Sequence, residues 1–124
     1  MNQSAAGSGS VVLAGGGTAG HTSPLIATGI ELRRLSPGLA LTALGTARGL
    51  ETTVVPAAGL ELELIPPVPM PRRAGKDLLL VGPRLLQAVQ ATVGLLRRTD
   101  ADVVLGFGGY VSTPAYLAAR RLGL

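Results

Sequence analysis

Two glycine-rich segments have the composition of a phosphate-binding site. The first, Gly15–Gly20, and the second, Gly106–Gly109, each follow an apolar run and precede a helical pattern. A backbone without side chains can approach a ligand closely, and the N–H groups at a helix start attract phosphate oxygens. The segments therefore predict a site for a diphosphate or for two separate anions. The residues expected at this anion are Gly16, Gly17, Gly106, Gly108, Gly109, Tyr110 and Ser112, the last two as hydroxyl donors.

Simpler readings of the same residues stay open. The glycines could serve only two tight strand-to-helix turns, although a turn alone rarely needs so many of them. Tyr110 could be a half-buried packing ring instead of a ligand donor.

His21 is the only histidine of the chain and directly follows the first glycine segment. An imidazole at a helix start beside a phosphate site can take a proton from an attacking hydroxyl near neutral pH. Alternatively, it donates one hydrogen bond to a phosphate or a carbonyl oxygen. Both roles place His21 in the site.

The first segment also satisfies the dinucleotide fingerprint G-x-G-x-x-G. That fingerprint requires an acidic residue at the end of the second strand to hold a ribose hydroxyl. The corresponding segment, Leu44–Arg48, has no carboxylate. Only Arg48, which could accommodate a 2′-phosphate, keeps an NADP-binding oxidoreductase domain open as an alternative.

Strand-like and helical patterns alternate around these segments. Apolar runs predict strands at 11–14, 39–44, 60–65 and 103–105. Helices are expected from an N-cap at Ser23 with Pro24 in the first turn, at about 49–58, through the eighties and nineties, and from Thr113 and Pro114. This order predicts an α/β fold, a Rossmann-like doubly wound parallel sheet with strand order 3-2-1-4. Both glycine segments then meet at the topological switch point, where ligands bind.

The third helix divides into a predicted core stripe and a predicted surface. At 100° per residue, the core arc contains Leu78, Val81, Leu85, Leu86, Val89, Thr92, Val93 and Leu96. Leu79 and Leu80 fall on the polar side. Exposed leucines among cations suit an anionic membrane surface, whereas a shift of register at Pro83 would make them a core turn. The predicted membrane contacts are Arg72, Arg73, Lys76, Leu79, Leu80 and Arg84.

The composition excludes several classes of protein. The 124 residues are 47% hydrophobic and 15% charged, which is too apolar for a disordered chain. The net charge of +4 suits an anionic partner, but two tyrosines, one phenylalanine and no tryptophan argue against stacking on nucleic acid. With no cysteine there is neither a disulfide nor a thiolate zinc site.

The chain is predicted to contain one domain. Residues 1–9 form a solvated tail, and residues 10–124 form the domain, which we expect to be truncated because a strand would normally follow the last helix.

Taken together, the two motifs resemble those of the MurG family of bacterial peptidoglycan N-acetylglucosaminyltransferases. The resemblance covers three segments: Ala14–His21 with Pro24, Leu44–Thr46 with Glu51, and Asp102–Pro114. It implies the incomplete N-terminal, acceptor-binding domain of a two-domain GT-B transferase. One departure is Ala19, where the family commonly has glycine; it tightens the approach of a ligand but keeps the N–H donor.

The resemblance also implies an activity and its partners. The complete protein would transfer N-acetylglucosamine from UDP-GlcNAc to lipid I with inversion, giving lipid II, as a peripheral protein on the cytoplasmic face of the cell membrane. His21 would be the base, Thr18, Ala19 and Gly20 would touch the donor, and both glycine segments would face the acceptor diphosphate. The basic, leucine-bearing segment 72–86 corresponds to the family's membrane-facing patch. No cofactor, metal ion or nucleic acid is expected, and the isolated chain is expected to be inactive.

A third hypothesis, after the transferase and the NADP-binding domain, is a non-catalytic module that binds anionic lipid. It predicts vesicle binding that does not depend on His21, whereas the transferase hypothesis predicts a large loss of rate when His21 is replaced.

Overall fold

The computed structural model describes residues 9–68 and 75–124, apart from the side chains of residues 76 and 77. Strands and helices alternate strictly along this part of the chain. Their bounds are β1 Ser10–Ala14, α1 Ala19–Leu35, β2 Ala40–Gly45, α2 Glu51–Ala57, β3 Glu61–Leu64, α3 Lys76–Arg98, β4 Val103–Gly106 and α4 Ser112–Arg121.

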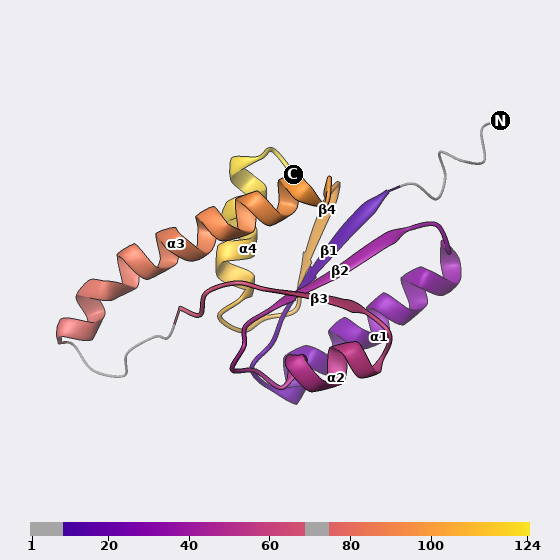
Figure 1. Cartoon of the computed structure of the whole chain (residues 1–124), viewed down its shortest axis with the longest axis horizontal. Coiled ribbons are helices and arrows are strands. Elements are labelled where there is room, and N and C mark those ends of the chain that lie inside the picture. The colour runs from indigo at the N-terminus through magenta and orange to yellow at the C-terminus, as the bar shows by residue number, and fades with distance from the viewer. Residues whose placement is uncertain (1–8, 69–74) are drawn as a thin grey trace.

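The strands form one parallel sheet in the order β3-β2-β1-β4. In this register Val12 of β1 lies opposite Thr42 of β2 and Val104 of β4. Helices α1 and α2 cover one face of the sheet, and α3 and α4 cover the other (Figure 1). The predicted doubly wound fold and its strand order are thus confirmed, and the loops that leave β1 and β4 are neighbours.

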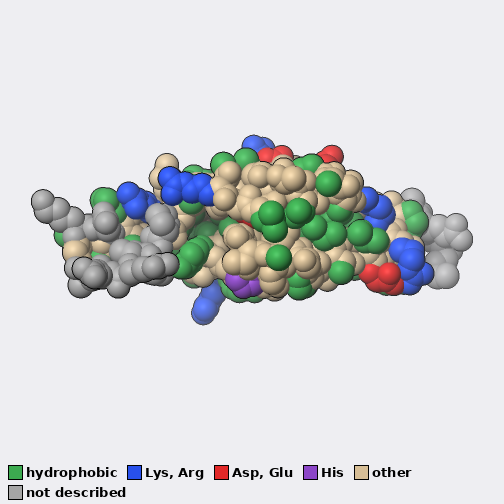
Figure 2. All heavy atoms as spheres, turned by 90° about the horizontal axis from the view of Figure 1, so that it is seen from below, with side chains coloured by type: hydrophobic (Ala, Val, Ile, Leu, Met, Phe, Trp, Pro, Cys, Tyr) green, Lys and Arg blue, Asp and Glu red, His purple; other side chains and the backbone are tan. Residues whose placement is uncertain are grey.

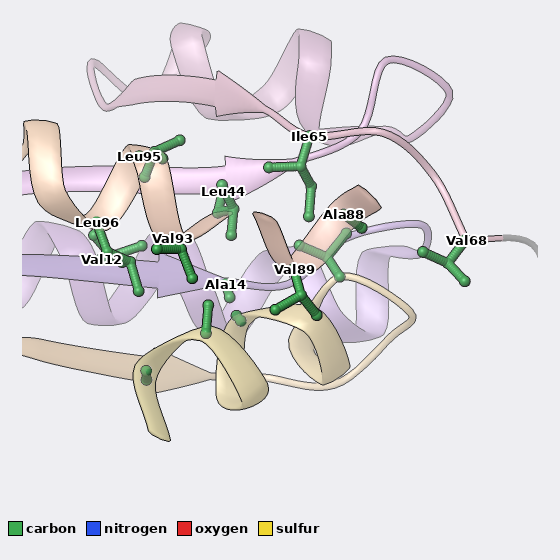
Figure 3. Close-up of a cluster of buried hydrophobic side chains, with 14 residues drawn as sticks. Val12, Ala14, Leu44, Ile65, Val68, Ala88, Val89, Val93, Leu95 and Leu96 are labelled. Carbon is green, nitrogen blue, oxygen red and sulfur yellow. The ribbon is translucent and has the colours of Figure 1, made fainter. Parts of the chain in front are cut away.

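Strand β1 lies in the middle of the sheet and supplies both halves of the core. Val12 and Ala14 belong to the cluster beneath α3 and α4, whereas Val11 and Leu13 belong to the cluster beneath α1 and α2. Figure 3 shows the first cluster, in which side chains of the strands meet those of α3. All five residues of β1 are buried, because helices cover both faces of the sheet.

The first helix begins earlier than predicted. Ser23 is not its N-cap; the helix starts at Ala19 with Thr18 as the N-cap residue. The Thr22 hydroxyl donates to the Thr18 carbonyl oxygen at 2.8 Å, and this hydrogen bond stabilises the first turn of the helix. Pro24 lies inside the helix. As a result, His21 occupies the first turn of α1 and not the loop before it.

The core stripe of α3 is shorter than the helical wheel predicts. Leu86 and Leu78 are 53% and 49% exposed, so their assignment to the core was wrong. The buried residues are Ala88, Val89, Thr92, Val93, Leu95 and Leu96. Figure 1 shows the N-terminal half of α3 extending beyond the sheet, and within the described residues Val81 and Leu85 of this half are only partly buried against the core cluster.

The other predicted membrane contacts differ in how far the structure describes them. Leu79 and Leu80 are exposed as expected, at 79% and 43%, and Arg84 is half-buried. Arg72, Arg73 and the Lys76 side chain lie outside the described residues. By length and composition alone, Leu78–Arg98 could cross a membrane. However, its C-terminal half already packs on the sheet, as the core helix of a globular domain does.

Candidate functional site

The loops after β1 and β4 come into direct backbone contact. The Phe107 N–H donates to the Ala14 carbonyl oxygen at 2.8 Å. A Cβ atom added at Gly109 would lie only 2.6 Å from the Gly16 carbonyl oxygen, and Gly109 has a φ of +83°. Only glycine permits both this approach and this backbone conformation. The prediction that the two glycine segments converge is therefore confirmed.

His21 lies where these loops meet. Its Nδ1 atom is 3.2 Å from the Gly16 carbonyl oxygen and 3.2 Å from the Thr18 hydroxyl oxygen. A carbonyl oxygen only accepts hydrogen bonds, so of the two neutral tautomers the contact with Gly16 favours the one that carries its proton on Nδ1. The lone pair of that ring is then on Nε2.

The Nε2 side of the ring faces the loop after β4. A Cβ atom added at Gly108 would lie 3.0 Å from His21 Nε2 and 2.8 Å from Cδ2, so only glycine permits the ring to lie this close to the loop. The ring is half-buried, and Figure 2 shows the histidine side chain, in purple, at the surface of the molecule. The ring is thus held between the two loops and reaches the surface of the molecule.

The start of α1 supplies hydrogen-bond donors next to His21. Thr18, Ala19 and Gly20 are exposed, and within the described residues no backbone acceptor is recorded for their N–H groups. The first N–H groups of a helix have no partner in the helix itself, and the helix dipole adds positive potential there. This end of α1 can therefore accept an anion.

Two of the residues predicted to bind the anion, Ser112 and Gly106, have close contacts within the protein. Ser112 is 3% exposed; its hydroxyl accepts the Gly108 N–H at 3.0 Å and lies 2.9 Å from the Gly108 carbonyl oxygen and 3.2 Å from that of Ala14. At Gly106, the phenol ring of Tyr116 fills the space that a Cβ would need. The Ser112 hydroxyl thus supports the loop from its buried side, and Gly106 provides space for Tyr116.

The N–H group of Gly17 also has a partner within the protein. It donates to Glu51 Oε2 at 3.0 Å, and the Thr46 N–H donates to Glu51 Oε1 at 3.0 Å. Sequence reasoning missed Glu51 as a residue that shapes the site. A signal was present, because Glu51 follows β2 closely and has glycines at 45 and 49 beside it.

A cleft of about 190 Å³ lies on the other side of the first glycine loop. Residues from the loops after all four strands line it: Gly16, Gly17, Thr46, Arg48, Gly49, Ile65, Pro66, Pro67, Val68, Tyr110, Val111 and Pro114. The segment 65–68 forms an apolar wall of this cleft. Tyr110 is 62% exposed and lines the cleft, whereas His21 does not. Gly16 therefore separates the cleft from the histidine.

Within the described residues, no group of three or more His, Asp or Glu side chains is placed to hold a metal ion.

A model of the glycosyltransferase family 28 N-terminal domain matches residues 11–124. The chain belongs to this family. The match agrees with the resemblance stated above and with the expected GT-B type of fold. It favours a glycosyltransferase over the NADP-binding alternative, which the engagement of the Gly17 N–H by Glu51 also weakens.

Relatives of the family 28 domain support this assignment. The chain is 64% identical over 114 residues to a UDP-N-acetylglucosamine–N-acetylmuramyl-(pentapeptide) pyrophosphoryl-undecaprenol N-acetylglucosamine transferase of a Nocardioides species, covering 92% of this chain and 31% of that protein. A protein of the same name from Corynebacterium jeikeium is 59% identical over 113 residues, covering 91% and 30%. The chain thus spans about a third of the length of these relatives.

A solved structure has the same fold. The crystal structure of MurG from Acinetobacter baumannii superposes with a TM-score of 0.78 at 28% sequence identity, covering 94% of this chain and 33% of that one.

Proposed function

We propose that this family 28 domain supplies the acceptor side of a transfer of N-acetylglucosamine from UDP-GlcNAc to lipid I. The names of the Nocardioides and Corynebacterium relatives state this donor and acceptor. In the reaction, the acceptor hydroxyl oxygen forms a bond to C1 of the sugar while the bond from C1 to UDP breaks. The hydroxyl proton must leave, and a base that receives it lowers the barrier.

The observation that carries the proposal is the fixed ring of His21. Its Nδ1 atom is engaged by Gly16, and the lack of a side chain at Gly108 keeps the Nε2 side of the ring free of a steric clash. We assign the proton transfer to Nε2. The N–H groups of Thr18, Ala19 and Gly20 lie on the same turn and are proposed to contact the donor.

The acceptor is proposed to bind along the first glycine loop and the adjoining cleft. Tyr110 and Arg48 line this cleft and provide a hydroxyl and a positive charge for a diphosphate. The backbone N–H groups of Gly16 and Gly109 are further candidate donors. In this proposal, Gly17, Gly108, Gly106 and Ser112 shape the site and do not themselves bind the anion.

We also propose that the N-terminal half of α3 docks on an anionic membrane from the cytoplasmic side. Leu79 and Leu80 project from the part of the helix that extends beyond the sheet, and Arg84 lies close to them in sequence. Apolar side chains flanked by cations are the surface that partitions into such a bilayer. An acceptor carried by a lipid diphosphate would be reached from this position.

The decisive experiment uses a chimera in which residues 11–124 replace the matching segment of the Nocardioides relative. The chimera is assayed with UDP-GlcNAc and a short-chain lipid I analogue, and we expect sugar transfer. His21→Asn retains an N–H near the position of Nδ1 but has no basic nitrogen. We expect it to lower kcat by at least about 100-fold with little change in KM.

Thr52→Ala is the matched control, because Thr52 is an exposed residue of α2 whose hydroxyl donates to the Gly49 carbonyl oxygen. It should keep the rate of the chimera. A folded chimera without activity would contradict the acceptor role, and full activity of His21→Asn would contradict the role of the base.

A further inference from the structure

Glu51 is a buried carboxylate that has no assigned role in the proposed reaction. It is the first residue of α2, and its side chain is fully buried. Burying a charged group is unfavourable unless its oxygens receive hydrogen bonds. The groups that donate to Glu51 therefore indicate what it holds in place.

The donors are backbone N–H groups from two different loops. Gly17, after β1, donates to Oε2, and Thr46, after β2, donates to Oε1, each at 3.0 Å. Hydrogen bonds to an ionised carboxylate are about twice as strong as bonds between neutral groups. One side chain thus ties the first glycine loop to the end of the neighbouring strand.

Three glycines provide the space that this carboxylate occupies. A Cβ atom added at Gly16, Gly45 or Gly49 would overlap with the Glu51 side chain. None of these three glycines has a positive φ, so backbone conformation does not explain them. We infer that they are glycines because Glu51 fills the space beside them.

The hydrogen bonds of Glu51 and His21 meet on a single peptide group. The peptide between Gly16 and Gly17 donates its N–H to Glu51 and accepts His21 Nδ1 at its carbonyl oxygen. A peptide group is planar, so fixing the direction of the N–H also fixes the direction of the C=O. If this peptide turned over, its carbonyl oxygen would face the carboxylate, which repels it.

We propose that Glu51 is a positioning residue that acts on His21 through this peptide. By orienting the Gly16 carbonyl, the carboxylate keeps the proton of the imidazole on Nδ1 and the lone pair on Nε2. The consequence for catalysis rests on the proposed function, whereas the effect on the ring is a property of the 124-residue chain itself.

The first test measures the His21 tautomer by ¹⁵N NMR in the chain at a pH where the ring is neutral. We expect a predominantly Nδ1–H ring in the wild type and a mixture of tautomers in Glu51→Ala and Glu51→Gln. Val55→Ala is the matched control, since Val55 is a fully buried residue of the same helix whose side chain belongs to the apolar cluster beneath α1 and α2. It should destabilise the domain and keep the Nδ1–H ring. An unchanged tautomer in the Glu51 variants would overturn the proposal.

A second test remains informative if the Glu51 variants do not fold. In Gly49→Ala, the new methyl group must push the carboxylate aside. We expect a Tm lower by about 10 °C and a mixed His21 tautomer, since overpacking a core commonly costs about 1–3 kcal/mol. If Glu51→Ala does fold, adding Gly49→Ala to it should leave Tm nearly unchanged. A Gly49→Ala variant with the wild-type Tm and tautomer would contradict the proposal.

Activity of the chimera separates this proposal from the proposed function. Glu51→Gln should lower kcat by about 10-fold, which corresponds to the loss of one hydrogen bond. Combined with His21→Asn, it should cause no further loss, because both changes act on the same group. If the tautomer shifts while neither variant lowers kcat, the positioning by Glu51 is supported and the base role is wrong. If the tautomer does not shift, the positioning is wrong whatever the rates are.

Discussion

At the scale of single residues, the site depends on side chains that satisfy loop backbone groups from the buried side. Ser112 does this for the loop after β4, as Glu51 does for the loop after β1. Its hydroxyl is buried and accepts the N–H of Gly108, the residue beside His21 Nε2. A side chain predicted to bind ligand therefore has a structural role, because the loop has no strand or helix partner for that N–H.

Replacing Ser112 by alanine should leave the Gly108 N–H without its acceptor. We expect Ser112→Ala to lower the free energy of unfolding by about 1–3 kcal/mol, the usual effect of a buried unsatisfied donor. Urea denaturation of the 124-residue chain measures it. Thr52→Ala, which removes an exposed hydrogen bond from a hydroxyl to a carbonyl oxygen, should lower the free energy of unfolding clearly less. Equal decreases in the two variants would show that the Ser112 bond stabilises the domain no more than an exposed one.

At the scale of elements, α3 has two halves with different neighbours. The C-terminal half packs on the sheet, while Leu79 and Leu80 lie on the half that extends past it. The same sequence pattern of leucines therefore acts as core in one half and as surface in the other.

The exposed half of α3 should control membrane binding. We expect Leu79→Gln combined with Leu80→Gln to weaken binding to vesicles containing phosphatidylglycerol by at least about 10-fold, since each buried leucine contributes about 1.5–3 kcal/mol. Co-sedimentation measures it. The control Leu35→Gln changes a leucine that is 63% exposed at the end of α1, on the opposite face of the sheet, and should bind normally. Equal binding by all variants would contradict membrane docking through α3.

Two glycines inside helices should respond in opposite ways to the same substitution. Gly94 of α3 has open space around its Cβ position, so Gly94→Ala should raise the free energy of unfolding by up to about 1 kcal/mol. A Cβ at Gly29 of α1 would lie 2.8 Å from the Leu60 side chain and 3.2 Å from that of Leu13, so Gly29→Ala should lower it. Thermal denaturation of both variants checks the signs. Stabilisation by both changes would show that α1 can move away from the sheet.

At the scale of the whole molecule, the site exists because segments about ninety residues apart in sequence come together. Strand order brings the loops after β1 and β4 into contact, and Gly109 lies against the Gly16 carbonyl. The His21 ring contacts both loops. The relative position of these loops is therefore a property of the sheet and not of either motif.

Gly109→Ala should disrupt this junction. The substitution introduces both backbone strain at a φ of +83° and a contact with the Gly16 carbonyl oxygen. We expect a Tm lower by about 10 °C, corresponding to a loss of a few kcal/mol. Gly123→Ala isolates the strain, because Gly123 has a φ of +76° and open space around it. If both variants melt alike, the contact between the loops contributes nothing to stability.

The sequence alone determined the fold class, the strand order and the importance of the two glycine segments. Short apolar runs between helical patterns permit few arrangements other than a doubly wound parallel sheet. Glycines and a histidine beside a helix start likewise indicate anion binding and proton transfer from the sequence alone. The start of α1 and the core stripe of α3 were predicted less well, since α1 begins four residues before Ser23, at Ala19, and the edge of the sheet has no signature in sequence.

Only the tertiary structure decided which groups of the glycine loops remain free to bind a ligand. The N–H of Gly17 is used by Glu51, and the hydroxyl of Ser112 is used by Gly108. The residue type determines whether a group can donate or accept a hydrogen bond. The fold determines which partner it finds, because that partner comes from a loop distant in sequence. The tautomer of His21 depends on the same contacts, because its neighbour is a backbone carbonyl whose direction the sequence does not encode locally.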